Sequence, residues 1–156
     1  LKYADFQTRY PGLLVQSVVG EALFELNAVS LLGYDEASVR SALEPLVDSL
    51  VRIDWNRRQL DTAWAKLFST AAVVEVLNLS DSSFSGEDLL LLLSKMPELK
   101  KVNLTGTEFS DEQVDSFRVH SNIETIVLTG TQLSEVGYQK LINHLPGADI
   151  ISDYSM

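Results

Sequence analysis

Apolar residues recur along this chain in a short pattern that is repeated every 24 or 25 positions. In each copy, an apolar residue is followed by two variable residues, a second apolar residue, one variable residue and a third apolar residue. Alternation of this kind is typical of a β-strand with one buried face. The clearest copies occupy 50–55, 74–79, 99–104 and 123–128. The near-constant distance between their starts indicates an internal repeat.

The remainder of each unit has the features of a turn followed by a helix. A polar bend follows the strand at 105–107 and again at 129–131. The segments 85–88 and 110–113 each place a serine three residues before a carboxylate or an amide, which is the capping-box pattern of a helix start. Apolar residues with helical spacing come next in one unit: Leu89, Leu92, Leu93 and Met96. Each unit is therefore predicted to be a strand, a turn and a helix.

The period predicts one repeat domain over 1–156, with units at 26–49, 50–73, 74–98, 99–122 and 123–147. A single unit cannot bury its apolar stripe alone, so neighbouring units must stack. Strands pack about 4.8 Å apart, whereas helices are wider, so the stack must curve. The expected fold class is α/β: a solenoid formed by a curved right-handed stack of strand–turn–helix units, with a parallel sheet on its concave face.

The two ends of the array carry their own predictions. In the first unit, Leu26 is expected to occupy the position that Leu50 has in the second unit. The side chains of the first strand that point outward are then those of Ala28, Ser30 and Leu32. Residues 1–25 are predicted to be a cap, a linker or a degenerate repeat. Without such a cover, the first unit is expected to continue into further sequence or to pack on a partner.

Residues 148–156 are predicted to form a partial strand with Asp153 at its third core position. A buried carboxylate is costly unless it is paired. Asp153 is therefore expected to oppose the stacking of another unit.

The unit resembles the leucine-rich repeat, whose pattern is L-x-x-L-x-L-x-x-N/C-x-L. The residues at these positions in one unit are Leu99, Val102, Leu104, Thr107 and Phe109. Threonine replaces the usual asparagine, and the segments 104–111 and 128–134 are similar to the "LxGTxxSD" segments of a bacterial form of the repeat.

The resemblance implies a module of a larger bacterial protein, in the periplasm or the cytoplasm, with the periplasm favoured. The stretch 26–55 is similar to the first repeat of C-terminal modules in cytochrome-like envelope proteins. Tyr34 and Arg58 depart from the pattern at the asparagine position, because neither supplies a compact buried hydroxyl or amide. A bend or bulge is expected in those two units.

Composition excludes several classes of function. The formal net charge is −10, from 22 acidic and 12 basic residues, whereas nucleic-acid binding requires a basic face. No apolar stretch approaches the roughly 18 residues that a membrane-spanning helix needs, so this chain is not expected to insert directly into a membrane. The chain contains no cysteine, which excludes disulfides and thiolate metal sites.

The variable strand residues are predicted to face outward in columns on the concave face. Arg52, Arg57 and Arg58 form a basic cluster there, with Lys101 two units further on. The cluster is interpreted as a solvated rim or as a positive island for an acidic protein partner. The candidate partner-binding residues are Arg52, Asp54, Asn56, Arg58, Asn78, Ser80, Lys101, Asn103, Thr105 and Thr125.

Catalytic and metal-binding chemistry has little support in the sequence. There is no phosphate-binding loop, nucleophile elbow or zinc-protease motif, so no enzyme activity and no cofactor are predicted. His120 and His144 fall at the same place in adjacent units. They are interpreted as helix-end residues that suit the helix dipole, with a two-histidine metal site as the alternative. Trp55 and Trp64 are predicted to pack in the core.

Two functions from different classes follow. The first is a protein–protein interaction module with a polar concave surface, as part of a larger protein. The second is a structural or spacer domain of a bacterial envelope or redox protein, with no dedicated ligand. Only the first requires a partner that recognises the concave face.

Overall fold

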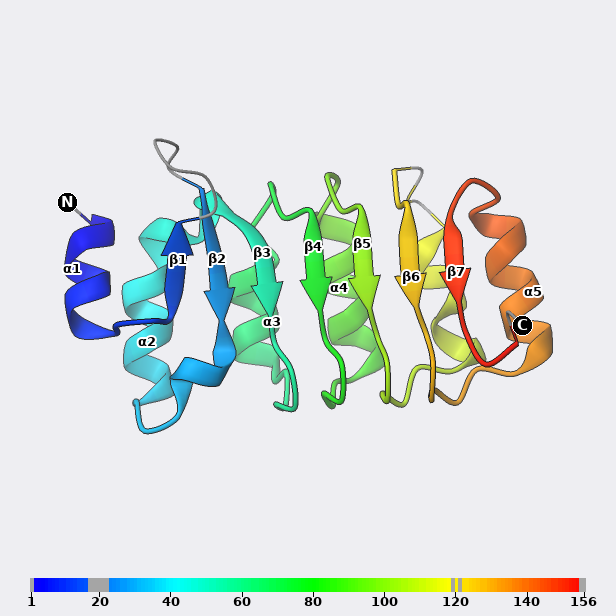
Figure 1. The fold of residues 1–156 in the computed structure, drawn as a ribbon, viewed down its shortest axis with the longest axis horizontal. Helices are drawn as coiled ribbons and strands as arrows, with labels where there is room; N and C mark the ends of the chain where they lie inside the picture. Colours follow the sequence, from blue (N-terminus) through cyan, green and yellow to red (C-terminus); the bar gives the residue numbers. More distant parts are fainter. Residues whose placement is uncertain (1, 17–22, 119, 121, 155–156) are drawn as a thin grey trace.

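The strands form a seven-stranded sheet whose order follows the sequence. The computed structural model describes residues 2–16, 23–118, 120 and 122–154. In this part of the chain, β1 is antiparallel to β2 and each later neighbour is parallel (Figure 1). The strands are β1 (Leu14–Gln16), β2 (Phe24–Asn27), β3 (Leu50–Asp54), β4 (Val76–Asn78), β5 (Lys101–Asn103), β6 (Thr125–Val127) and β7 (Asp149–Ile151). The predicted α/β class and a mostly parallel sheet are confirmed.

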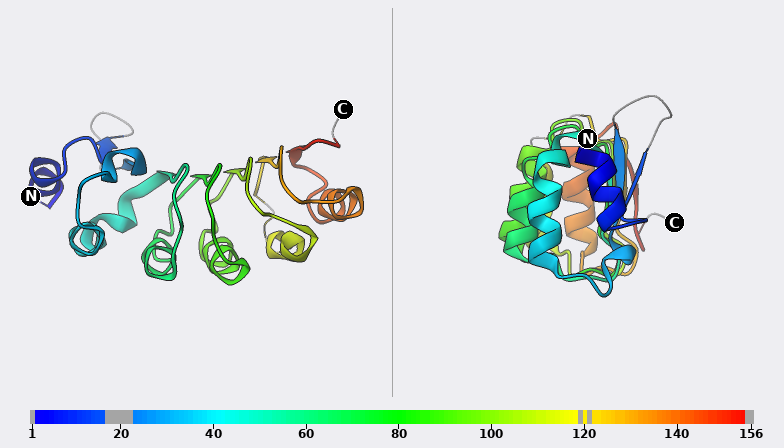
Figure 2. Two further views of the ribbon diagram at one scale, coloured as in Figure 1. Left: turned by 90° about the horizontal axis from the view of Figure 1, so that it is seen from below. Right: turned by 90° about the vertical axis from the view of Figure 1, so that its left-hand side faces the viewer.

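Helices cover one face of this sheet. Figure 2 shows α2 to α5 on the outer side of a shallow arc, and no described helix over the opposite face of β3 to β6. None of the described helices is long and apolar enough to cross a membrane. The helices are α1 (Lys2–Arg9), α2 (Glu36–Leu43), α3 (Thr62–Phe68), α4 (Gly86–Lys95) and α5 (Glu135–His144), with 3₁₀ segments η1 (Ala28–Leu31), η2 (Glu44–Ser49) and η3 (Asp111–Phe117).

The two predicted helix starts are capped by side chains, by the serine in one unit and by the glutamine in the next. Ser85 accepts a hydrogen bond on its hydroxyl from the backbone N–H of Asp88 at 3.1 Å. In the next unit, the backbone N–H of Ser110 donates to the side-chain carbonyl of Gln113 at 2.9 Å. Both bonds satisfy N–H groups that would otherwise lack partners at a helix end.

The strands β3 to β6 pair in a constant register. Ile53 pairs with Leu77, Leu77 with Val102, and Val102 with Ile126, so each strand pairs with the strand of the next unit at the equivalent position. All four side chains are buried, because they point toward the helices. Buried helix residues close this core from the other side: Phe68, Leu92, Phe117 and Leu141.

The predicted register of the first unit is wrong. Leu26 pairs with Ile53 rather than with Leu50, and the ladder shifts between Phe24 and Glu25. Ala28 lies in η1 and is fully buried, so Ala28, Ser30 and Leu32 do not extend the outer columns. Those positions belong to Glu25, which pairs with Arg52, and to Asn27, which pairs with Asp54.

The described residues between 2 and 25 show no strand–turn–helix order like that of the later units. They contain α1 and the antiparallel strand β1, followed by the start of β2. Phe6, Tyr10 and Leu13 are buried, and α1 lies beside the β1 edge of the sheet (Figure 1). The interpretation of 1–25 as a cap, a linker or a degenerate repeat stays a prediction.

The last strand is also shifted from its predicted register. Ile126 pairs with Ile150, so Ile150 rather than Ile151 points into the core. A slip of one residue moves every side chain to the opposite face. Ser152 is therefore buried and Asp153 is exposed. The prediction of a core position for Asp153 is wrong, and its carboxylate accepts a hydrogen bond from the backbone N–H of Gly130 at 3.1 Å.

The turns after β3, β4, β5 and β6 have a positive-φ residue at the same position of the unit. The residues are Arg57, Asp81, Gly106 and Gly130, with φ of 57°, 55°, 71° and 71°. One position later in the third of these turns, the buried Thr107 hydroxyl donates to the carbonyl of Leu104 at 2.7 Å. This is the compact hydroxyl that the sequence predicts at the asparagine position.

Candidate functional site on the open face of the sheet

The candidate site is the helix-free face of β3 to β6, whose side chains stand in register. Arg52, Val76, Lys101 and Thr125 are direct neighbours across the four strands. Asp54, Asn78, Asn103 and Val127 form the adjacent column. These residues alternate with the buried core residues, and each is at least partly exposed. The structure thus brings most of the predicted partner-binding residues onto one surface.

Arg52 is held within this face by Asp54. Its Nε lies 3.1 Å from both carboxylate oxygens, and the amide nitrogen of Asn78 donates to Oδ1 at 3.4 Å. The hydrogen bond to Asp54 raises the pKa of the Arg52 guanidinium above its ordinary value. Arg52 is therefore a fixed part of a neutralised pair, rather than a free cation that waits for a partner.

The two asparagines of the face stabilise the turns that follow their strands. The side-chain carbonyl of Asn78 accepts from the backbone N–H of Ser80 at 3.1 Å. Asn103 accepts from the backbone N–H of Thr105 at 3.0 Å and from its hydroxyl at 2.6 Å. Such local bonds fix an Asx-type turn. Asn78, Asn103, Ser80 and Thr105 thus have structural partners, although they remain half-exposed.

Lys101 is the most available cation on the face. Its side chain is exposed, and no ion pair among the described residues includes it. Its neighbour Lys100 lies 3.1 Å from Glu75, and this bond raises the pKa of the Lys100 ammonium. Lys101 is therefore free to pair with a carboxylate of another molecule.

Arg58 and Asn56 lie at the rim, beyond the end of β3. Arg58 is 3.2 Å from Glu36, and its guanidinium lies 5.5 Å from the ring centre of Trp55. Glu36 also accepts a hydrogen bond from the indole of Trp64 at 2.7 Å. Trp55 and Trp64 are fully buried, which confirms their predicted place in the core.

Glu36 has a bridging role in this region that the sequence pattern did not predict. It links α2 to Arg58 and to Trp64, which lie 22 and 28 positions further along the chain. No local motif marks such a bridge. The positive φ angle of Arg57 is a second feature that the sequence does not predict. Arginine rarely adopts a positive φ angle, so the residue type gives no sign of the turn.

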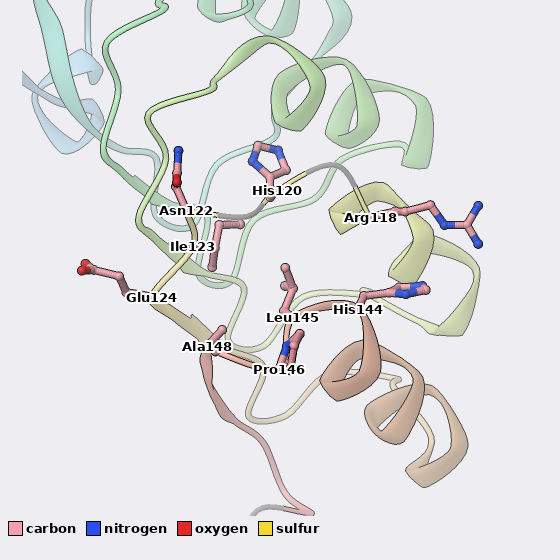
Figure 3. Close-up of a pocket in the computed structure, with 10 residues that line it drawn as sticks. Arg118, His120, Asn122, Ile123, Glu124, His144, Leu145, Pro146 and Ala148 are labelled. Carbon is pink, nitrogen blue, oxygen red and sulfur yellow. The ribbon is translucent and has the colours of Figure 1, made fainter.

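The two histidines contact different groups. Both line a surface pocket of about 560 Å³ near the ends of η3 and α5 (Figure 3). The ring of His120 contacts the carbonyl of Leu93, whereas His144 lies 3.0 Å from Asp115. Burial lowers the pKa of His120. The described residues contain no group of three or more side chains that could hold a metal, so the two-histidine alternative gains no further ligand.

The comparisons with known proteins add no relative. No protein-family model matches the chain, and no curated protein matches it significantly in sequence.

Proposed function

We propose that this chain is a leucine-rich repeat solenoid that binds another protein through the open face of its sheet. Three features support the solenoid assignment. Equivalent strand residues pair from one unit to the next, four turns have a positive-φ residue at the same place, and the Thr107 hydroxyl bonds to the carbonyl of Leu104. Arrays of such units present extended binding surfaces.

The observation that carries the binding function is the uncovered face of β3 to β6. Parallel sheets usually have both faces covered by helices. Here no described helix covers one face of β3 to β6 (Figure 2). Besides Val76 and Val127, that face carries charged, amide and hydroxyl side chains. The partner contacts are centred on four residues: Arg52, Asp54, Asn78 and Lys101.

The composition of the face favours a modest affinity. Interface hot spots are enriched in tryptophan, tyrosine and arginine, whereas both tryptophans of this chain are buried. Arg52 is already paired with Asp54, so a partner gains little from its charge. The exposed Lys101 is the strongest electrostatic contributor that the face offers.

The test is affinity capture followed by affinity measurement with charge variants. A partner captured by the wild-type chain should bind Lys101→Glu several-fold more weakly, because the lost attraction becomes repulsion. Lys95→Glu is the matched control, since Lys95 lies in the last turn of α4 on the helix side. Equal affinity for the wild type and Lys101→Glu would contradict the proposal. The alternative, a spacer domain of an envelope or redox protein, predicts no partner that depends on this face.

A further inference from the structure

A surface pocket lies at the rim of the candidate face, beyond the carboxyl ends of β3 and β4. Its volume is about 420 Å³, and it is lined by Leu32, Asn56, Arg57, Arg58, Ser80 and Asp81. The lining therefore combines one aliphatic residue with two arginines. This combination occurs in a chain whose net charge is −10.

Leu32 supplies the aliphatic part of the lining. Its side chain is 81 % exposed, whereas the adjacent Leu31 is 2 % exposed and belongs to the core. A single exposed leucine is ordinary on a protein surface. Leu32 differs because it lines a pocket whose other lining residues are polar or charged.

Arg57 supplies the available cation. Its side chain is 83 % exposed, and its only ion pair among the described residues is a 4.0 Å contact with Asp81. Exposed pairs of this kind contribute little stability, so an incoming carboxylate can replace Asp81 easily. Arg58, by contrast, is held by Glu36 at 3.2 Å.

The backbone at Arg57 has the turn geometry that the other units share. Its φ angle is 57°, and the equivalent positions of two later units are the glycines Gly106 and Gly130. A positive φ costs a non-glycine residue about 1–2 kcal/mol. Positive φ recurs at this position in all four turns, with Asp81 in the next one, so the geometry of the turn accounts for it and the turns differ in the side chain that they carry there.

We propose that this pocket binds a segment of a partner protein that places an aliphatic side chain against Leu32 and a carboxylate on Arg57. The inference rests on the proposed interaction function and names the chemistry of the partner. Asn56 and Ser80 add uncharged polar residues to the lining. The overall negative charge of the chain disfavours acidic partners elsewhere, so local complementarity decides where such a segment docks.

The test is an NMR titration of the whole chain with a short probe peptide, acetyl-Leu-Glu-Leu-Glu-amide. The matched probe is the same peptide with glutamine in place of glutamate. We expect shifts at the Arg57 side-chain N–H and the Leu32 methyl groups with the acidic probe only. Arg57→Gln, which removes the charge and keeps a polar side chain, should weaken binding about fivefold. Leu32→Ser should weaken it by a similar factor, and Lys95→Gln should leave it unchanged.

Three outcomes would overturn the inference. Equal binding of the glutamine peptide would remove the carboxylate from the recognition. Saturation by free glutamate at the same concentration would indicate a free-carboxylate site instead of a protein-docking site. Absence of binding, or shifts centred on Lys101, would show that this pocket does not bind the acidic peptide. None of these results affects the Lys101→Glu test of the open face, so failure of the inference and failure of the proposed function are distinguishable.

Discussion

Two regions of this molecule stabilise the turns between stacked strands with different side chains. From β5 to β7, each turn uses small residues: glycine at the positive-φ position, and the threonines Thr107 and Thr131, whose hydroxyls donate to backbone carbonyls at 2.7 and 2.8 Å. From β2 to α3, the equivalent turn carries Arg57 and Arg58. There, an aromatic cluster and a carboxylate bridge replace the small polar residues.

The aromatic cluster and the carboxylate bridge lie side by side in the irregular region, from β2 to α3. The rings of Trp55 and Trp64 lie 4.7 Å apart between centroids, and Phe68 packs against both. Glu36 receives a bond from Trp64 and one from Arg58. The regular region also buries aromatic side chains, Phe109 and Phe117, but both tryptophans of the chain, the bulkiest residues of the core, lie in the irregular region. The irregular region is therefore the one that single substitutions should damage most.

The largest effect is expected at Trp64. Trp64→Ala should lower the free energy of unfolding by about 3–5 kcal/mol, because it removes a fully buried aromatic side chain. Gln113→Ala is the matched substitution, since both residues lie three positions after a helix N-cap, and it should cost only about 1 kcal/mol. Chemical denaturation of both variants measures the difference. Equal losses would contradict the contrast between the two regions.

A smaller effect, with opposite signs in the two regions, is expected at the positive-φ position. Gly106→Ala should destabilise the chain by about 1–2 kcal/mol, because φ is 71° and an added Cβ atom would collide with the carboxylate of Asp81. Arg57→Gly should stabilise it by up to about 1 kcal/mol, because glycine relieves the strain. Thermal unfolding under identical conditions gives both signs. Destabilisation by Arg57→Gly would mean that the arginine side chain supports the fold.

The smallest effect concerns pH in the regular region. Burial lowers the pKa of His120 from the ordinary 6.5, so below that pH the unfolded state binds a proton that the folded state does not. Stability due to this group is complete above pH 6.5 and falls as the pH drops toward the folded pKa, by at most about 1.4 kcal/mol per pH unit.

Denaturation at about pH 7.5 and about pH 5.5, on either side of the ordinary histidine pKa, tests this expectation. His120→Gln keeps a donor for the carbonyl of Leu93 and should show a weaker fall than the wild type, whereas His144→Gln should retain it. The same fall in wild type and His120→Gln would assign the dependence to other groups.

The regular region could be predicted because its apolar residues fix the register unambiguously. Ile53, Leu77, Val102 and Ile126 each occupy the middle of a three-membered apolar pattern, and they pair as the period requires. The outer columns of these strands follow directly from the alternation.

The ends could not be predicted in the same way, because their patterns fit two registers. Ile150 and Ile151 are adjacent, and only the pairing with Ile126 shows which one is buried. In the first unit, Leu26 and its neighbours match the repeat by letter, yet the shift of the ladder between Phe24 and Glu25 moves the strand. The Glu36 bridge depends on contacts between distant residues, which no local pattern contains.

Thiol labelling is the most direct test of whether a partner protein binds the open strand face. Because the chain contains no cysteine, single-cysteine variants report one position each. Thr125→Cys places the thiol on the strand face, and Ser94→Cys places it on the exposed side of α4. A captured partner should slow the labelling of the thiol at position 125 and leave the labelling rate at position 94 unchanged. Protection at position 94 alone, or at neither position, would contradict binding at this face.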